Sequence, residues 1–325
     1  MRKLFFLLSF LLPFSSVYAD ESSDALALLQ KMHLASQKNN YSGTFVLQQD
    51  NQIFSSSIAH RFEDGDEWEK VARLDGRARE YTRHNEDIVS YQPDSKSIRT
   101  EKRQQQDDFP AVLAFNGANL SEHYSFKLAE VARVAGNDCR VIIVEPKDAL
   151  RFGYRFCAAL QNNLMLQTQT TDLTNKVLEQ ISFSSINFGA VDENFLKTSY
   201  PNTKDWKTVK GAVTVSTSSG WAVKKLPTGF KKIREVRRLI SYHFEPNSKD
   251  KFAFHEVLQL VFSDGLATVS VFIEPVNDDQ HNAVNQQGAT TIFSRKQGDF
   301  WVTIVGEVPM TSIKLISDSI EYKAK

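Results

Sequence analysis

Few side chains in this sequence have the type and spacing to carry chemistry, and two cysteines are the clearest of them. Cys139 and Cys157 lie in strand-like segments on either side of a turn region at residues 147–151. An antiparallel pairing of these segments centred near Asp148 would place the two thiols opposite each other, where they could form a disulfide. The alternative is two separate buried thiols that pack as small hydrophobic side chains. The sequence leaves both arrangements open.

The sequence lacks the spacings that are typical of metal and catalytic sites. The seven histidines are scattered, and there is no nucleophile elbow, phosphate-binding loop or dinucleotide fingerprint. Carboxylates that meet only in the folded chain could still form an active site. We expect no metal and no cofactor, and we interpret the chain as a binding protein rather than an enzyme.

Basic residues concentrate between positions 224 and 238, where Glu235 is the one acidic residue. They are Lys224, Lys225, Lys231, Lys232, Arg234, Arg237 and Arg238. Arg and Lys bind phosphate and carboxylate groups through charge-assisted hydrogen bonds, so this surface could bind an acidic peptide or a phosphorylated lipid. The alternative is a solvated strand face. We take Arg234 and Arg237 as candidate partner contacts.

The first residues predict export. Arg2 and Lys3 precede an apolar run at residues 4–12, and small residues at 17–19 form a cleavage site before Asp20. This pattern is typical of a secretory signal peptide over residues 1–19, and we expect the mature protein in the periplasm. The formal net charge is zero, so no overall field would recruit nucleic acid, and we expect no nucleic-acid partner.

A first domain is predicted over residues 20–200. Apolar residues at helical spacing indicate a helix at 24–38, capped by Ser22 or Ser23. After it come strand-like runs separated by turn-forming residues, which predict a large curved antiparallel sheet or open barrel that the helix covers. A helical or irregular insert is expected at 109–119. The runs are residues 41–48, 53–62, 67–74, 79–84, 87–92, 97–102, 124–134, 139–146, 154–160, 164–172 and 177–188.

A polar linker at residues 201–212 precedes a second domain at 213–325, so the fold class is α+β. Its expected elements are a small antiparallel sheet and a packed helix at 311–322 whose apolar stripe is Ile313, Ile316 and Ile320. The expected strands are residues 220–225, 231–236, a hairpin within 255–274, 289–295 and 300–305.

The hairpin is the most strongly patterned stretch. Asp264 and Gly265 supply the turn, and alternation places two sets of three apolar residues on the core face. These are Leu258, Leu260, Phe262, Val269, Val271 and Ile273. Thr268, Ser270 and Phe272 lie on the opposite face, which we expect to be wet. An apolar Phe272 on that face suggests a contact surface.

Phenylalanine is abundant in the first domain. An open barrel can leave its concave face partly unfilled, and an aromatic cavity there could hold acyl chains. The alternative is an ordinary core. The candidates for a lipid cavity are Phe45, Phe54, Phe126, Phe156 and Phe183.

Four segments resemble those of a known family. They are LDGRAREYTRHNEDIVSY at 74–91, LPTGF at 226–230, LVFSDGLATVSVFIE at 260–274 and VTIVGEVP at 302–309. Together with the signal peptide and the two domains, they resemble the RseB/MucB family of periplasmic sigma-factor regulators. The resemblance implies a lipid-sensing first domain like the lipoprotein carriers of the LolA/LolB type, with an open barrel and a hydrophobic cavity.

The resemblance also implies a function. A family member binds the periplasmic part of an inner-membrane anti-sigma factor of the RseA/MucA kind and shields it from proteolysis, so the envelope-stress sigma factor stays inactive. Lipopolysaccharide or mislocalised lipoprotein is thought to release the partner. The small domain is implied to make much of the contact, with Asp264, Gly265, Phe272, Gly306 and Pro309 as candidates. The two glycines could equally serve only their turns.

A second function comes from a different class. The chain could be a periplasmic lipid or lipoprotein carrier that uses the cavity of the first domain, and it could also form a homo-oligomer. A carrier of this kind would not need residues 211–325, so the second domain favours the regulator.

Overall fold

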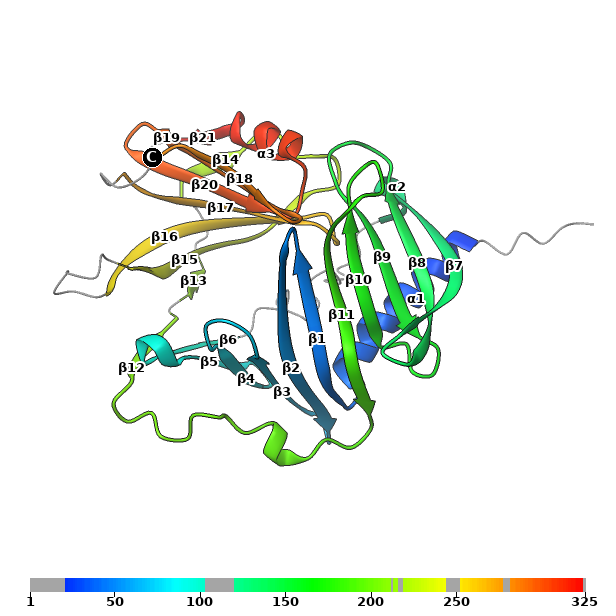
Figure 1. The fold of residues 1–325 in the computed structure, drawn as a ribbon. Coiled ribbons are helices and arrows are strands. Elements are labelled where there is room, and N and C mark those ends of the chain that lie inside the picture. Colours follow the sequence, from blue (N-terminus) through cyan, green and yellow to red (C-terminus); the bar gives the residue numbers. More distant parts are fainter. Residues whose placement is uncertain are drawn as a thin grey trace, which may run out of the picture.

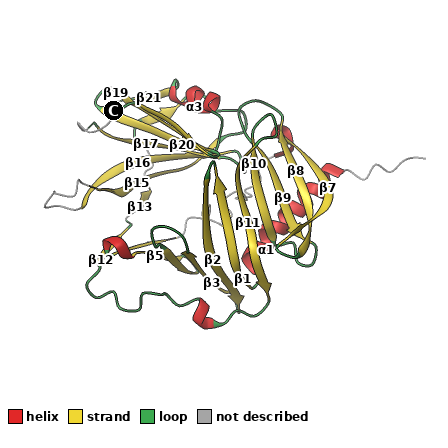
Figure 2. Ribbon diagram, in the orientation of Figure 1, coloured by secondary structure: helices red, strands yellow, loops and turns green. Residues whose placement is uncertain are grey.

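The computed structural model describes residues 21–102, 120–211, 213–215, 219–243, 252–276 and 281–323. The predicted signal peptide at 1–19 and the predicted insert at 109–119 lie outside these residues. Strands dominate the fold, which has one large sheet, a second sheet of seven strands and few helices (Figure 2).

The first domain is one twelve-stranded sheet with a helix across it (Figure 1). Its order is β12-β6-β5-β4-β3-β2-β1-β11-β10-β9-β8-β7, so two meanders meet where β1 pairs with β11, and the sheet stays open. The elements are α1 (Glu21–Lys38), β1 (Tyr41–Gln49), β2 (Gln52–Glu63), β3 (Asp66–Arg73), β4 (Glu80–His84), β5 (Asp87–Gln92), β6 (Ser97–Lys102), α2 (Leu120–His123), β7 (Tyr124–Val134), β8 (Asn137–Pro146), β9 (Gly153–Ala159), β10 (Met165–Thr171), β11 (Val177–Phe188) and β12 (Lys207–Lys210). The predicted large open antiparallel sheet is confirmed.

Helix α1 covers one end of this sheet. Ala25, Leu29 and Met32 recur at helical spacing and are fully buried against β7 to β10. Burial of this apolar stripe, rather than helix propensity alone, stabilises a helix of this length. The turns follow their sequence as well: Asp64 and Gly65 both have positive φ, 51° and 94°, as a tight hairpin between β2 and β3 requires.

The expected linker is partly structured. Its residues Lys207–Lys210 form β12, which pairs in parallel with β6. Tyr200 precedes this strand and lies between Tyr91 and Trp206, with ring centroids 5.9 Å and 5.4 Å away. Strand β12 joins the edge of the sheet through backbone hydrogen bonds and has no apolar periodicity. Because periodicity is the main signal for a strand, the sequence predicts a linker here.

The second domain holds a seven-stranded sheet of order β13-β15-β16-β17-β20-β19-β18, a two-stranded sheet β14-β21 and helix α3. Its elements are β13 (Val213–Val215), β14 (Trp221–Val223), β15 (Lys231–His243), β16 (Phe252–Ser263), β17 (Thr268–Pro275), β18 (Ala283–Gln287), β19 (Thr290–Gln297), β20 (Phe300–Gly306), α3 (Met310–Ser317) and β21 (Ile320–Tyr322). The predicted antiparallel sheet with a packed helix near the C-terminus is confirmed.

The last helix is shorter than predicted. It ends at Ser317, and the residues expected to continue it form β21, which pairs with β14. The Ser319 side chain accepts a hydrogen bond from the Lys225 N–H and donates one to the Lys225 carbonyl, so it ties the chain to the segment that follows β14. These tertiary hydrogen bonds outweigh the helical pattern. Ile320 is still buried, because it enters the core from the strand.

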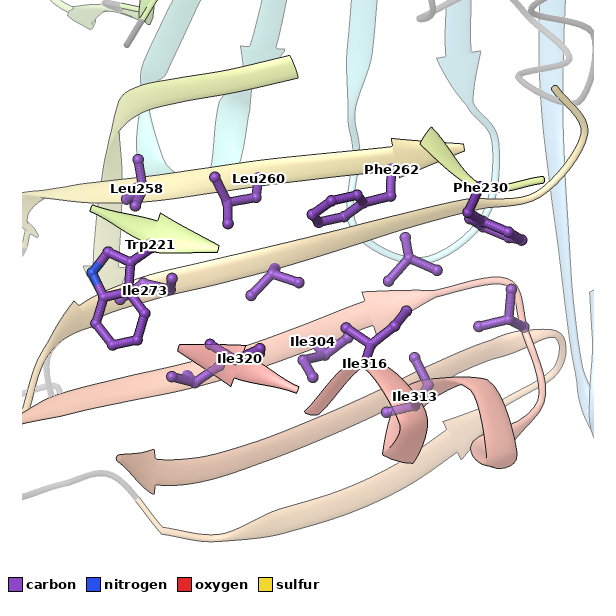
Figure 3. Packing of buried hydrophobic residues seen from close by; sticks show 14 of the residues in the cluster. Trp221, Phe230, Leu258, Leu260, Phe262, Ile273, Ile304, Ile313, Ile316 and Ile320 are labelled. Atoms are coloured by element: carbon purple, nitrogen blue, oxygen red, sulfur yellow. The ribbon is translucent and has the colours of Figure 1, made fainter. Parts of the chain in front are cut away.

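The core of the second domain lies between the hairpin and helix α3 (Figure 3). Leu260 and Phe262 of β16 point toward Ile304 of β20 and Ile316 of α3, and Leu258 belongs to the same cluster. The six apolar hairpin residues predicted for the core face all belong to this cluster. Alternation along the two strands therefore identified the buried face correctly.

Cys139 and Cys157 form a disulfide. Strands β8 and β9 pair so that Cys139 lies opposite Ala159, and Cys157 lies opposite Val141. The cysteines are thus diagonal rather than direct neighbours, because the turn places the register one residue beyond the centre expected at Asp148. Both are buried in the large domain.

Candidate partner-binding surface

Two of the candidate partner residues share one face of the seven-stranded sheet. Arg234 on β15 is paired with Val261, and Phe272 on β17 is paired with Gln259, so alternation places both on the face that points away from the core cluster. Gln259 donates to the Ser270 hydroxyl at 2.9 Å across the strands. We refer to Arg234, Gln259, Ser270 and Phe272 as the hairpin face.

The hairpin face is less wet than the sequence predicts. Val257, Gln259 and Val261 are at most 5% exposed, while Ser270 and Phe272 are half-buried and Thr268 is exposed. The Arg234 Nε and Nη1 atoms and the Gln259 Oε1 atom are shielded from solvent, without a hydrogen-bond partner among the described residues. A polar partner that forms the missing hydrogen bonds would remove the free-energy cost of leaving these atoms unsatisfied.

Arg237 lies on the opposite face of the sheet, at a groove. Its guanidinium pairs with Glu256 at 2.8 Å, and both side chains are about half exposed. The groove has a volume of about 470 Å³, with Leu258 and Ile273 in its lining. We call it the aromatic groove, because Trp221, Phe300 and Tyr322 also line it.

The three rings of the aromatic groove contact one another. The Trp221 centroid lies 5.1 Å from Phe300 and 4.9 Å from Tyr322, and Tyr322 is 49% exposed. Exposed aromatic side chains beside a pocket are frequent anchors at protein interfaces. The sequence did not reveal this groove, because the rings are far apart in the chain and Tyr322 was assigned to a helix.

Asp264 lies between the two domains rather than on the surface. It is 2% exposed, and its Oδ1 atom accepts hydrogen bonds from the Leu266 and Ala267 N–H groups at 3.0 and 2.9 Å. Its Oδ2 atom accepts from the Arg151 guanidinium at 2.8 Å and from the Tyr124 hydroxyl at 2.9 Å. We refer to Arg151 and Asp264 as the interdomain ion pair.

The interdomain ion pair is fully enclosed. Both charged side chains are 0% exposed, and Arg151 also donates to the Thr228 carbonyl at 2.7 Å. Burial, together with the Asp264 carboxylate, raises the pKa of Tyr124 well above its ordinary value, so the hydroxyl remains a donor. Arg151 was not predicted, because an arginine in a turn between two strands reads as solvent-exposed.

Neighbouring contacts extend the same junction. Leu266, from the turn of the small-domain hairpin, packs in the core beneath helix α1. The Thr311 hydroxyl donates to the Ala149 carbonyl at 3.1 Å, and the Ser312 hydroxyl donates to the Leu150 carbonyl. The hairpin turn therefore helps to fix how the small domain sits on the large one.

The remaining candidates have structural explanations. Gly265 has a φ of 101° in the hairpin turn, and a Cβ atom on Gly306 would lie 2.8 Å from the Val269 side chain. Pro309 precedes helix α3, and its carbonyl accepts hydrogen bonds from the Ser312 and Ile313 N–H groups. All three could serve the fold alone, and their contact with a partner stays a prediction.

The basic residues between 224 and 238 do not form one continuous patch. Alternation along β15 places Arg234 and Arg237 on opposite faces of the sheet. Lys224 pairs with Glu321 at 3.6 Å and Lys232 pairs with Glu235 at 2.8 Å, so carboxylates balance part of the positive charge.

The five phenylalanines predicted for a lipid cavity lie in separate places. Phe126 and Phe156 pack with helix α1, whereas Phe45 and Phe183 pack edge to face in another cluster, 6.2 Å apart. Phe54 is half-buried under the Arg73 guanidinium, at 3.9 Å from the ring centroid. The described structure does not gather them around one cavity, and lipid binding stays a prediction.

Two further properties concern the described residues alone. They contain no group of three or more His, Cys, Asp or Glu side chains that could hold a metal ion. None of their helices is long and apolar enough to cross a membrane.

Comparisons with known proteins cover nearly the whole chain. Residues 24–208 match the MucB/RseB N-terminal domain family, and residues 215–321 match the MucB/RseB C-terminal domain family. The sigma-E factor regulatory protein RseB of Haemophilus influenzae is 26% identical over 332 residues, which are 99% of this chain and 100% of that protein. The sigma factor AlgU regulatory protein MucB of Pseudomonas aeruginosa is 28% identical over 319 residues, 95% of this chain and 94% of the relative.

Solved structures give the same result. The complex structure of Pseudomonas aeruginosa MucA/MucB superimposes with a TM-score of 0.71 at 27% identity, covering 93% of this chain and 100% of that chain. A crystal structure of MucB gives a TM-score of 0.65 at 25% identity, with 93% and 99% coverage. The resemblance that the four sequence segments indicated is confirmed.

Proposed function

This chain belongs to the MucB/RseB family, and we propose that it binds the periplasmic part of a membrane-embedded anti-sigma factor and so keeps an envelope-stress sigma factor inactive. Bound in this way, the anti-sigma factor would be shielded from the protease that starts its destruction. Release when lipopolysaccharide or mislocalised lipoprotein is sensed belongs to the same proposal.

One observation carries the proposal. The similarity to MucB in complex with MucA extends over 93% of this chain and includes both domains. A lipid carrier would need only the large domain, whereas here a small domain is present and is joined to the large one through buried contacts.

We propose the small domain as the main contact, with the hairpin face and the aromatic groove as the two places where the partner binds. The hairpin face offers unpartnered polar atoms beside Phe272, and the groove offers a half-exposed tyrosine beside a cavity. An apolar or aromatic side chain of the partner would contribute most binding free energy at the groove, because its apolar surface would be buried away from water there.

We place the protein in the periplasm and assign it no catalytic activity. The charged and apolar pattern of residues 1–19 supports export, and the Cys139–Cys157 disulfide fits an oxidising compartment. The regulatory names of the relatives support a binding role.

The test is direct binding. We expect the purified protein to bind the periplasmic domain of an anti-sigma factor from the same organism, and we expect that domain to be cleaved more slowly in the complex. Deletion of the gene should raise envelope-stress transcription. If the protein neither binds that domain nor slows its cleavage, and stress transcription is normal in the deletion strain, the proposed function is wrong.

Tyr322→Ala distinguishes the aromatic groove from other surfaces. We expect it to weaken binding about tenfold, as loss of an interface anchor commonly does. Phe195→Ala is a matched control, because Phe195 is a 62% exposed aromatic residue of the large domain. Equal affinities of both variants and the unchanged protein would remove the groove from the interface.

A further inference from the structure

The two domains touch at a second place on the same seam as the interdomain ion pair. There the turn between β1 and β2 and strand β11 meet the turn between β18 and β19. Asp50 accepts a hydrogen bond from the Gly288 N–H at 2.8 Å. Gln49 donates to the Gln287 carbonyl at 3.1 Å and to the Glu179 carboxylate at 2.8 Å.

Carboxylates gather at this contact. Glu179 on β11 accepts a hydrogen bond from the Ala289 N–H of the small domain. The charge of Asp50 raises the pKa of Glu179, and the charge of Glu179 raises the pKa of Glu307. Glu307 follows β20, and its N–H donates to the Thr268 carbonyl. We refer to Asp50, Glu179, Gly288 and Glu307 as the acidic contact.

No cation balances these carboxylates. Among the described residues, no Lys, Arg or His forms an ion pair with Glu179 or Glu307. The other titratable group that senses Glu307 is Tyr154 of β9, whose pKa is raised well above its ordinary value by burial and then by Glu307, so it stays neutral. Tyr154 also senses Arg151 and Asp264, and the Arg151 charge is met by the Asp264 and Asp148 carboxylates.

The pKa of Glu307 is correspondingly perturbed. Burial, and then the charge of Glu179, raises it to about 7. Burial also raises the pKa of Glu179, with Asp50 acting in the same direction, while the Gln49 and Ala289 hydrogen bonds oppose the shift. As the pH rises through about 7, Glu307 releases its proton and places a negative charge beside Glu179.

The geometry gives a charged contact a way to open. A cavity of about 210 Å³ lies beside Glu307, with Leu266 and Thr290 in its lining, so water can reach the carboxylate once the turns move apart. The turns are in close approach: a Cβ atom on Gly288 would lie 2.5 Å from Gln49 and 3.0 Å from Glu179.

We propose that the acidic contact is a proton-dependent clasp between the domains, closed while Glu307 is protonated and open when its carboxylate is ionised beside Glu179. The interdomain ion pair holds the other part of the seam at either pH, so the small domain turns about it. This inference concerns the chain itself and stands whether or not the proposed partner binds.

The test is a distance measurement across the acidic contact. Ile53 and Val284 are 63% and 67% exposed and lie on β2 and β18, the strands beside the contact. Ile53→Cys and Val284→Cys in the full-length protein can carry spin labels, because the two native cysteines are already joined in a disulfide. We expect one short distance at pH 5.5, a longer second population at pH 8.5, and a midpoint near 7.

Variants decide whether Glu307 is the cause. Glu307→Gln should keep the short distance at both pH values, whereas Glu321→Gln, a change at an exposed glutamate of the same domain, should leave the pH response intact. A second label pair at Lys147→Cys and Lys314→Cys, near the interdomain ion pair, should show one distance throughout. Unchanged wild-type distances between pH 5.5 and 8.5, or a response that persists in Glu307→Gln, would overturn the proposal. If Glu307→Gln does not fold, Glu179→Gln is the equivalent test.

Discussion

The two contacts that join the domains use buried charge in opposite ways. At the interdomain ion pair, the Arg151 and Asp264 side chains are both fully enclosed, and both oxygens of the Asp264 carboxylate accept hydrogen bonds. At the acidic contact, Glu179 and Glu307 are buried in large part without a cation. A balanced pair keeps its charge state across the physiological pH range, whereas like charges must take up or release a proton. The seam thus combines a permanent joint with one that can respond.

The largest expected effect comes from removing one partner of the balanced pair. Asp264→Ala removes the fully buried carboxylate and leaves the Arg151 guanidinium with the partly exposed Asp148 carboxylate, so we expect the free energy of unfolding to fall by about 3 kcal/mol, the low end for a broken buried pair. Urea denaturation measures this change. A loss below about 1 kcal/mol would mean that the ion pair does not hold the seam.

The acidic contact should make stability depend on pH. The pKa of Glu307 is raised to about 7 in the folded protein, above the ordinary value of 4.5, so its favourable contribution is complete below pH 4.5 and is lost as pH rises to 7. We expect a loss of about 2–3 kcal/mol over this interval, since each pH unit is equivalent to about 1.4 kcal/mol.

Denaturation at a series of pH values tests this dependence. Glu307→Gln should flatten the curve between pH 4.5 and 7, because the amide does not titrate. An equally steep curve in that variant would assign the dependence to other groups.

Gly288 offers a way to disturb the acidic contact without changing its charge. Gly288→Ala adds strain at a φ of 56° and a clash with Gln49, and we expect it to cost about 1–2 kcal/mol and to open the contact even at pH 5.5. Gly298→Ala is the matched control, because Gly298 has a similar φ of 61° and open space around it. Equal losses in the two variants would show that only backbone strain matters.

The smallest effect on stability should come from breaking an exposed arginine–carboxylate ion pair, the same type of pair as Arg151 and Asp264. Arg237 and Glu256 also lie 2.8 Å apart, but both are about half exposed. Glu256→Ala should cost less than about 1 kcal/mol, because solvent screens the attraction. A cost close to that of Asp264→Ala would mean that burial does not distinguish the two pairs.

Much of the fold could be predicted because its signals are local. The alternation in β16 and β17 identified which hairpin side chains enter the core, and turn residues such as Asp64 and Gly65 separated the strands of the large sheet. Elements held by tertiary pairing were predicted less well: β12 read as a linker, and β21 read as the end of a helix.

The candidate site shows the same limit. The sequence singled out Asp264 for its turn, and the turn is present, but nothing local indicates that its other oxygen meets Arg151 from the large domain. Similarly, Trp221, Phe300 and Tyr322 gather only in the folded domain. Long-range contacts of this kind depend on the packing of whole domains and leave no periodic signal in the sequence.

The pairing of β1 with β11 has a consequence for the order of folding. Within each meander of the large sheet, neighbouring strands are joined by short turns, so their contacts are local and can form early. The β1–β11 ladder instead pairs Tyr41 with Phe188, the first and last strand residues of the two meanders. Closing so long a loop has a high entropic cost, so the centre of the sheet should form last, after both meanders of the large domain have formed.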